Sequence, residues 1–107
     1  DDDDGILSTW LEVCSELDDR IMKGAQGKAP VKATWNSSYA VGNLLANPTL
    51  PRAICLHKAV RDCVQRVIKR LEVLVVSDNG FTHNKKIRIH AIGALAKVPS
   101  LGHFGGL

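Results

Sequence analysis

Residues 50–77 read LPRAICLHKAVRDCVQRVIKRLEVLVVS, and this stretch decides the fold. Its apolar residues recur at intervals of three and four, which places them on one face of a helix. That face holds Leu56, Val60, Cys63, Val64, Val67, Leu71, Leu74 and Val75. The opposite face is mostly basic. This division at the helical period predicts one long amphipathic helix over residues 50–77.

The same spacing, followed outward, predicts three more helices over residues 6–22, 31–46 and 84–97. Glycine and proline separate them: residues 24–30, Asn47-Pro48 and Pro99 stop helices, and Asn79-Gly80 ends the long one. Residues 101–107 contain three glycines and no period, so a loop is expected there. The sequence therefore predicts an all-α fold of about four helices.

One side of the second predicted helix carries small residues. Ser38 and Gly42 share that side with Trp35 and Leu45. Small side chains allow the backbone of a neighbouring helix to approach closely. A close helix contact is therefore predicted along this side of residues 31–46.

Length and composition place the chain among ordinary globular domains. It has 107 residues, of which 45% are hydrophobic and 23% are charged, which excludes a disordered tail and a disulfide-dense toxin. The net charge of +3 is too small to identify nucleic acid as the partner. No apolar run approaches the roughly 18 residues of a membrane span. The acidic start, residues 1–4, is unlike a secretory signal.

The three cysteines are predicted to be free, buried thiols. Cys14, Cys55 and Cys63 all fall on apolar helix faces. Cys55 and Cys63 are eight residues apart on one predicted helix, a rise of roughly 12 Å, too far for a disulfide. Free thiols indicate a reducing compartment, so the expected location is the cytoplasm or the nucleus.

The sequence contains no complete motif for a catalytic site or for a metal-binding site. Residues 24–28, GAQGK, contain part of a phosphate loop but lack its first glycine and its hydroxyl. Cys55 and His57 point to nearly opposite helix faces, and no pair of metal-ligand residues has the usual spacing. Buried thiols do not suit a cysteine hydrolase. The sequence therefore predicts a protein that is not an enzyme, with no cofactor and no metal.

The predicted helices also suggest an internal repeat. Residues 33–41 align with residues 87–95 at an offset of 54, and in each case a long amphipathic helix comes first. The offset exceeds the roughly 40–47 residues of HEAT and armadillo units, and the long third helix with its flanking loops can absorb the excess. The repetition of a long helix, a loop and a short alanine-rich helix predicts antiparallel helix pairs.

Two segments carry a family resemblance: residues 32–48, KATWNSSYAVGNLLANP, and residues 86–100, KIRIHAIGALAKVPS. Their patterns, order and spacing resemble the family of HEAT-repeat-containing protein six over residues 28–107. Ala33 and Thr34 depart from it, since the family has valine and arginine there. The resemblance implies a C-terminal piece of a HEAT/armadillo-like α-solenoid, a non-enzymatic scaffold. Residues 31–80 and 81–107 are then the repeat-like parts, and residues 1–30 are a first helix with its linker.

The main candidate site is a polar ridge on the second predicted helix. Lys32, Asn36, Tyr39 and Asn43 are spaced four, three and four, so they follow one line along the helix. An asparagine amide offers both a donor and an acceptor to a peptide backbone, and an aromatic ring offers a wall for side chains. The ridge thus predicts binding of a protein or an extended peptide, with Lys32 or Arg88 reaching an acidic side chain. The alternative is that both asparagines bond loop carbonyls and Tyr39 packs.

A basic helical module that binds RNA or DNA is the second hypothesis. Its candidate surface is the basic stripe of the long helix, interrupted by Asp62: Lys58, Arg61, Arg66, Lys69 and Arg70. No aromatic residue lies between them to stack on bases, which favours a solvated helix face.

A repeat unit buries its apolar face only against neighbouring repeats. Self-association is therefore predicted as well, through the Trp10 face or residues 87–98.

Overall fold

Every secondary-structure element in the described part of the chain is helical. The computed structural model describes residues 2–76 and 84–101. Its elements are α1 (Asp2–Ala25), α2 (Val31–Leu45), α3 (Leu50–Leu56), α4 (Lys58–Val76), α5 (Lys85–Leu95) and a 3₁₀ helix, η1 (Val98–Leu101). The all-α prediction is confirmed over these ranges, with five α-helices where four were expected. The expected stop at Asn79-Gly80 lies outside the described residues.

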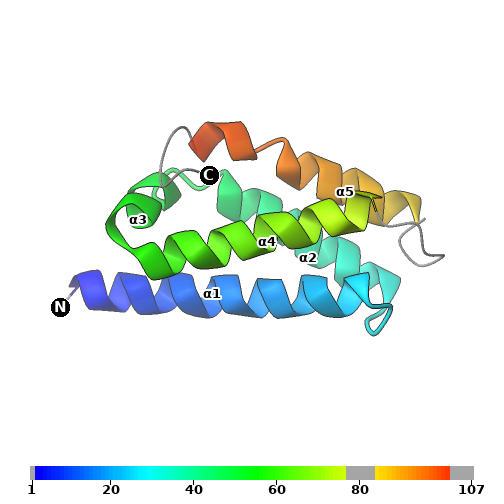
Figure 1. Ribbon diagram of the computed structural model, residues 1–107, viewed down its shortest axis with the longest axis horizontal. Coiled ribbons are helices and arrows are strands. Elements are labelled where there is room, and N and C mark those ends of the chain that lie inside the picture. The colour runs from blue at the N-terminus through cyan, green and yellow to red at the C-terminus, as the bar shows by residue number, and fades with distance from the viewer. Residues whose placement is uncertain (1, 77–83, 102–107) are drawn as a thin grey trace.

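The four longer helices form two layers. α1 packs against α4 in one layer, and α2 packs against α5 in the other. Figure 1 shows that α1 and α4 run in the same direction, whereas α2 and α5 both run back. Contacts of α1 with α2 and of α4 with α5 join the layers. The described chain extends over 45 × 23 × 17 Å, with its long axis along the helices.

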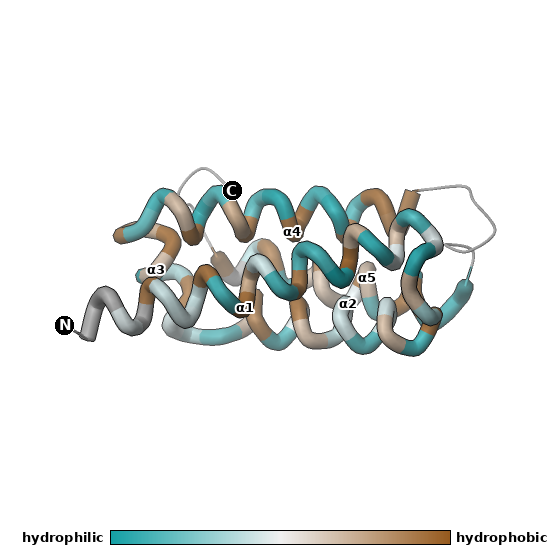
Figure 2. The backbone as a smooth tube through the Cα atoms, turned by 90° about the horizontal axis from the view of Figure 1, so that it is seen from below, coloured by the Kyte–Doolittle hydropathy of each residue, from teal (hydrophilic) through white to brown (hydrophobic). Residues whose placement is uncertain are grey.

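The core lies between the two layers. α4 contributes most to it through Val60, Cys63, Val64, Val67, Leu71 and Leu74, all of which are buried. Figure 2 shows this division, with the hydrophobic colour on the side of α4 that faces the other helices. Full burial of one such aliphatic side chain contributes about 1.5–3 kcal/mol. The part of the predicted stripe that lies on α4 is therefore the largest contribution of a single helix to the described core.

The predicted long helix over residues 50–77 is interrupted at His57. The backbone there is extended, with φ −129° and ψ 106°. The N–H of His57 still donates to the carbonyl of Ala53 at 2.9 Å, while its carbonyl accepts from Val60 and Arg61 at 3.1 Å. His57 thus ends α3 and begins α4, and the prediction of one continuous helix is wrong.

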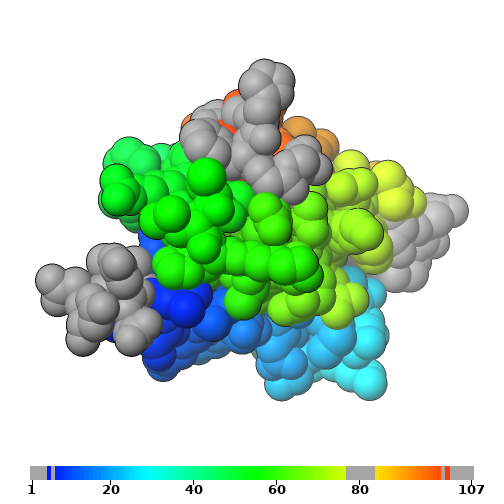
Figure 3. All heavy atoms as spheres, turned by 60° about the vertical axis from the view of Figure 1, so that its left-hand side comes forward, coloured from blue at the N-terminus to red at the C-terminus, as the bar shows by residue number. Residues whose placement is uncertain are grey.

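Burial explains why the helix breaks. In a continuous helix Leu50 would lie about 80° around the axis from Val60, at the edge of the apolar stripe, and Ile54 would lie about 120° from Val60, outside the stripe. The break turns α3 across the end of the layers, as Figure 3 shows from that end, and buries Leu50 and Ile54 completely. Leu56 is instead 59% exposed, although its spacing placed it on the stripe. Two buried aliphatic side chains outweigh the exposure of one.

One cysteine does not lie where it was predicted, because Cys55 stands about 140° around a helix from Val60 and so falls outside the apolar stripe. Cys55 lies in the last turn of α3 and is exposed, whereas Cys14 and Cys63 are buried. The prediction that all three thiols are buried is therefore wrong for Cys55. Burial therefore disfavours a reactive thiol at Cys14 and Cys63 but not at Cys55.

The end of the described chain is more ordered than the glycine content suggests. Val98–Leu101 form the 3₁₀ helix η1, which contacts α2, and Leu101 is fully buried. The expected loop therefore does not include Leu101, whose side chain joins the core. Residues 102–107, the rest of that expected loop, lie outside the described residues. Within the described ranges, no helix combines the length and hydropathy that a membrane crossing requires.

Candidate functional site

The close contact predicted for α2 is made with α5. A Cβ added to Gly42 would lie 3.4 Å from the Cα of Ala94, so the two backbones approach closely here. Ala91 and Ala94 are buried on the α5 side, and Ser38 is fully buried on the α2 side. The Ser38 hydroxyl donates to the carbonyl of Thr34 at 3.1 Å, which satisfies it inside the seam. Small residues thus allow α2 and α5 to pack closely, so that the two helices present one continuous outer surface.

Aromatic side chains from both helices meet on this surface. The ring of His90 stacks on Trp35 with centroids 4.8 Å apart and planes at 17°. Tyr39 meets the same imidazole edge-on, at 5.8 Å and 89°. The Lys86 ammonium lies over the Trp35 ring, 5.3 Å from its centroid and within the range of a cation–π contact. These contacts fix the rings of α2 against α5.

A groove runs beside this cluster, between α2 and α5. It encloses about 440 Å³, and its lining includes Tyr39 and Asn43 from α2 and Ile89, His90, Gly93 and Lys97 from α5 and the residues after it. Tyr39 is 57% exposed and Ile89 is 54% exposed. A Cβ added to Gly93 would meet no atom within 4 Å, so this part of the groove is open. We call this feature the α2–α5 groove.

The two walls of the groove repeat one pattern. Lys86, His90, Gly93 and Lys97 follow the spacing of four, three and four that defines the ridge Lys32, Asn36, Tyr39 and Asn43. The offset is again 54 residues, the offset found from the sequence. Because α2 packs along α5, the later members of both patterns line one groove: Tyr39 and Asn43 on α2, with His90, Gly93 and Lys97 opposite them.

The predicted ridge residues do not all face the α2–α5 groove. Tyr39 and Asn43 line it, Lys32 is exposed in the first turn of α2, and Asn36 lines a different hollow. Arg88 is half-buried on α5 and does not line the groove. The structure therefore brings together two of the five candidate residues and adds His90, Gly93, Ile89 and Lys97 to them.

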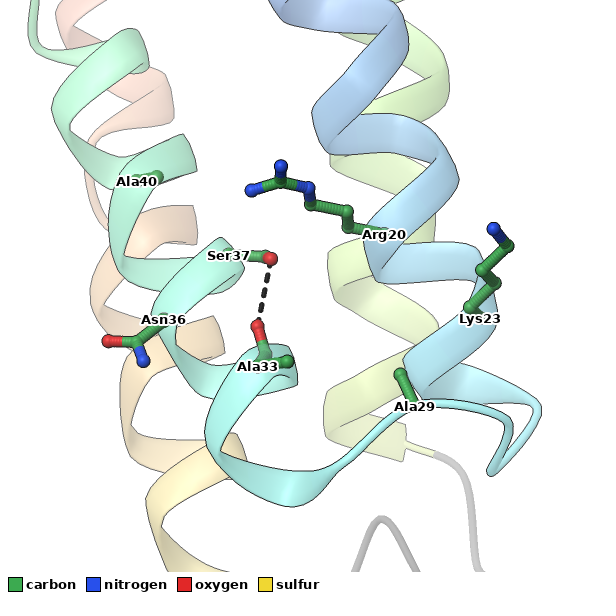
Figure 4. A pocket seen from close by; sticks show the side chains of 7 residues that line it. All are labelled: Arg20, Lys23, Ala29, Ala33, Asn36, Ser37 and Ala40. Carbon is green, nitrogen blue, oxygen red and sulfur yellow. Dashed lines mark hydrogen bonds between the residues drawn. The ribbon is translucent and has the colours of Figure 1, made fainter.

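The second hollow lies between α1 and α2. It encloses about 360 Å³ and is lined by Ala29, Ala33, Ser37 and Ala40 beside Arg20, Lys23 and Asn36. Figure 4 shows the Arg20 side chain reaching across from α1 toward α2, with the Ser37 hydroxyl donating to the carbonyl of Ala33 at 2.8 Å. Its floor is made of small side chains with few free polar groups. The hollow could therefore receive a ligand by shape, but it has few polar groups that could recognise one.

The basic stripe of α4 is partly neutralised. Lys58 pairs with Asp62 at 3.2 Å, and Arg70 pairs with Asp18 of α1 at 3.1 Å. Arg61 is half-buried, while Arg66 and Lys69 are exposed. Because α1 places carboxylates next to α4, a phosphate backbone would meet a mixed surface there. Nucleic-acid binding stays an alternative, although two of the five basic side chains on this surface are paired with carboxylates.

His90 is the most informative of the groove residues that were not predicted from the sequence. Taken alone it was one of four unremarkable histidines, because no ligand or nucleophile lies at a useful spacing from it. The repeat offset was the signal that could have found it, since residue 90 is the equivalent of Asn36. Among the described residues, no group of three or more His, Cys, Asp or Glu side chains is placed to hold a metal ion.

Comparison with known proteins adds no relative. No family model matches the chain, and neither a curated protein nor a solved structure matches it. The resemblance of residues 28–107 to the family of HEAT-repeat-containing protein six therefore stays a prediction.

Proposed function

We propose that this protein is a non-enzymatic HEAT/armadillo-like scaffold that binds an extended peptide segment of a partner protein in the α2–α5 groove. The observation that carries the proposal is the composition of the groove. An exposed aromatic ring, Tyr39, and an exposed amide, Asn43, stand on one wall beside an open floor at Gly93.

The helix arrangement supports the solenoid part of the proposal. α1 with α2 and α4 with α5 make two successive helix pairs, and like helices of the pairs lie side by side. In a solenoid of paired helices, the second helices line one surface that is shared by successive repeats. In this interpretation α2 and α5 are those helices.

The groove offers the chemistry that an extended chain needs. A peptide strand presents alternating N–H and C=O groups, and the Asn43 amide can accept from one and donate to another. The Tyr39 ring gives its side chains an apolar wall. The absence of a side chain at Gly93 leaves room for the peptide backbone to approach α5.

The test uses two variants, Asn43→Ala and Tyr39→Ala, against peptides selected from a random library on the parent protein. Loss of the Asn43 amide should weaken binding by about 1–3 kcal/mol, because peptide groups would stay unpaired. Gly93→Leu should leave the fold intact, because a Cβ added at Gly93 meets no atom within 4 Å. The leucine side chain should then fill the groove and exclude the peptide. Asn36→Ala is the matched control, because Asn36 lies on the same helix but lines the other hollow.

Two results would contradict the proposal. If all three groove variants stay folded and bind as tightly as the parent, the peptide site is elsewhere or absent. If Asn43→Ala and Tyr39→Ala both unfold, these residues serve packing, which was the alternative left open by the sequence.

Self-association stays a prediction, and the exposure of apolar side chains indicates which of the two predicted faces would be used. Trp10 is half-buried and packs against the core, so its face is less available than the sequence indicated. On α5, Ile89 and Ile92 are 54% and 53% exposed. We infer that any contact between copies uses α5, where it would compete with peptide.

A further inference from the structure

We infer that the face of the α1–α2 pair that is turned away from α4 and α5 binds the exposed side of α5 in a second copy, so that copies join head to tail. The inference uses the arrangement of helix pairs in the function proposed above, but it does not depend on the peptide site. A correspondence between an open hollow and the packed contact of α2 with α5 carries it.

The receiving face contains two adjoining hollows. The hollow of about 360 Å³ described above continues into one of about 320 Å³, since Arg20 and Ala40 line both. Glu16 and Leu17 of α1 and Asn43 of α2 are among the residues that line the second hollow. Figure 4 shows α4 and α5 behind α1 and α2 in a view into the first hollow. The two hollows together follow the open side of the α1–α2 pair.

The α2 wall of the first hollow repeats the side of α5 that already receives a helix. Positions 54 residues apart are Asn36, Ser37 and Ala40 in the hollow, and His90, Ala91 and Ala94 on α5. The α5 members meet α2, since His90 stacks on Trp35 and Gly42 approaches Ala94. The α2 members line an open hollow instead. The offset therefore identifies this hollow as a helix-binding surface that no described helix fills.

The exposed side of α5 repeats the side of α2 that packs in this contact. Trp35 and Ser38 lie on that side of α2, and the residues 54 positions later are Ile89 and Ile92. These isoleucines are 54% and 53% exposed. Exposed apolar side chains on one helix face mark an interaction site. The α5 helix of a second copy therefore offers the apolar side that the hollow is shaped to receive.

The two faces fit each other only head to tail. They lie on different helices and differ in shape, so a contact between them uses a different face of each copy. Such a heterologous contact leaves one face of each kind free, and further copies add in line. The contact continues between copies the packing of α2 along α5 within one copy.

One pair of carboxylates opposes this contact. Within one copy, Asp18 pairs with Arg70 across α1 and α4. The residues at an offset of 54 from them are Glu72 on α4 and Glu16 on α1, which the same packing would bring together between copies. Glu72 is exposed, and Glu16 has Arg20 as its partner. We therefore expect a weak association that becomes stronger when the charge of Glu72 is reversed.

The experiment uses variants that block one face each. Ala33→Glu and Ala40→Glu place a charged side chain in the hollow, and Ala33 is exposed, so that its variant should fold even if the other does not. Ile92→Glu blocks the exposed side of α5, and Leu56→Glu on α3, at a similarly exposed position, is the matched control. Sedimentation equilibrium over a range of concentrations measures the average mass of each variant and of mixtures. Thermal melting is the check on folding.

We expect the average mass of the parent and of Leu56→Glu to rise with concentration beyond that of a dimer. Each blocked variant alone should lose about tenfold or more in its association constant. A mixture of Ala33→Glu with Ile92→Glu should form a heterodimer, because each supplies the intact face that the other lacks. Glu72→Arg should associate about two- to fivefold more tightly than the parent, because an ion pair replaces two like charges.

The inference fails on any of three results. A parent that stays monomeric at every concentration has no such contact. Association that depends on Ile92 but not on Ala33 or Ala40 indicates a symmetric contact between two α5 helices. A mixture that forms no heterodimer excludes the head-to-tail arrangement.

These results are separate from those for the proposed peptide site. If copies join as expected but no peptide depends on Tyr39 or Asn43, the peptide function fails and the inference stands. If peptides bind through these two residues and the parent stays monomeric, the inference fails and the proposed function stands.

Discussion

The three thiols differ in exposure, which makes their reactivity a residue-scale test of the packing described for α1, α3 and α4. Cys55 is exposed on α3, whereas Cys14 and Cys63 are fully buried between α1 and α4. A disulfide reagent should therefore label one thiol rapidly in the native protein and the other two only on unfolding. Mass spectrometry of the labelled peptides checks this. Slow labelling of Cys55, or rapid labelling of Cys14 or Cys63 in the native protein, would contradict the described burial.

Burial also makes the Cys14 thiol a probe of alkaline stability. Desolvation, with a smaller contribution from neighbouring Cys63, raises the pKa of Cys14 from 9.0 to about 12. Between these values the unfolded chain loses a proton that the folded chain keeps. The free energy of unfolding should therefore be unaffected by this thiol below pH 9, and should fall by up to about 1.4 kcal/mol per pH unit above it.

Urea unfolding at a series of alkaline pH values measures this dependence. Cys14→Ala should show a shallower loss of stability than the parent above pH 9, and Cys55→Ala, which removes an exposed thiol, should keep the parent slope. Equal slopes in the parent and in Cys14→Ala would show that the folded protein does not hold the Cys14 proton.

At the scale of single helices, two glycines are expected to respond in opposite ways to alanine. Gly93 lies inside α5 and an added Cβ meets nothing, so Gly93→Ala should raise the free energy of unfolding by about 0.5–1 kcal/mol. Gly24 lies in the last turn of α1, and an added Cβ would overlap the Thr34 side chain. That side chain is buried and donates to the carbonyl of Pro30 at 3.0 Å, so it cannot move freely.

Gly24→Ala should therefore destabilise the protein, and chemical denaturation of both variants checks the contrast. Two stabilising substitutions would mean that the contact between the end of α1 and the start of α2 is looser than described. Two destabilising ones would mean that the floor of the groove is not open at Gly93.

The start of α5 depends on one side chain. The Asn84 amide oxygen accepts from the backbone N–H groups of Lys86 and Ile87 at 3.0 and 3.3 Å. Asn84→Ala should cost about 1 kcal/mol of stability, because the helix loses this cap. Asn84→Asp keeps an acceptor and should stay near the parent. Denaturant midpoints distinguish them, and an equal loss in both variants would argue against capping.

At the scale of the whole molecule, the ion pair between Asp18 and Arg70 joins α1 to α4. Arg70 Nε donates to Asp18 Oδ1 at 3.1 Å, and the Asp18 side chain is only 17% exposed. A double-mutant cycle with alanine should give a coupling energy of about 1 kcal/mol. The pair Lys58–Asp62, within α4 and more exposed, is the control and should give about 0.3–0.5 kcal/mol. A weaker coupling for Asp18–Arg70 than for the control would contradict the packing of α1 on α4.

The sequence by itself determined the helical class and most helix boundaries, because the apolar period and the glycine and proline breaks are local signals. The sequence also showed which side of α2 another helix could approach closely, because the small size of Ser38 and Gly42 does not depend on which helix packs there. The 54-residue offset was likewise visible, although its meaning for residue 90 was not.

Only the tertiary structure decided what depends on contacts between distant residues. The break at His57 exists because Leu50 and Ile54 gain burial against the layers, a gain that no local period reveals. The same break exposes Leu56, which a continuous helix would place on the apolar stripe. The groove needed both α2 and α5, because His90 acquires its place only where it meets Trp35 and Tyr39. A single helix specifies which side chains share a face, but the packing of helices decides what that face meets.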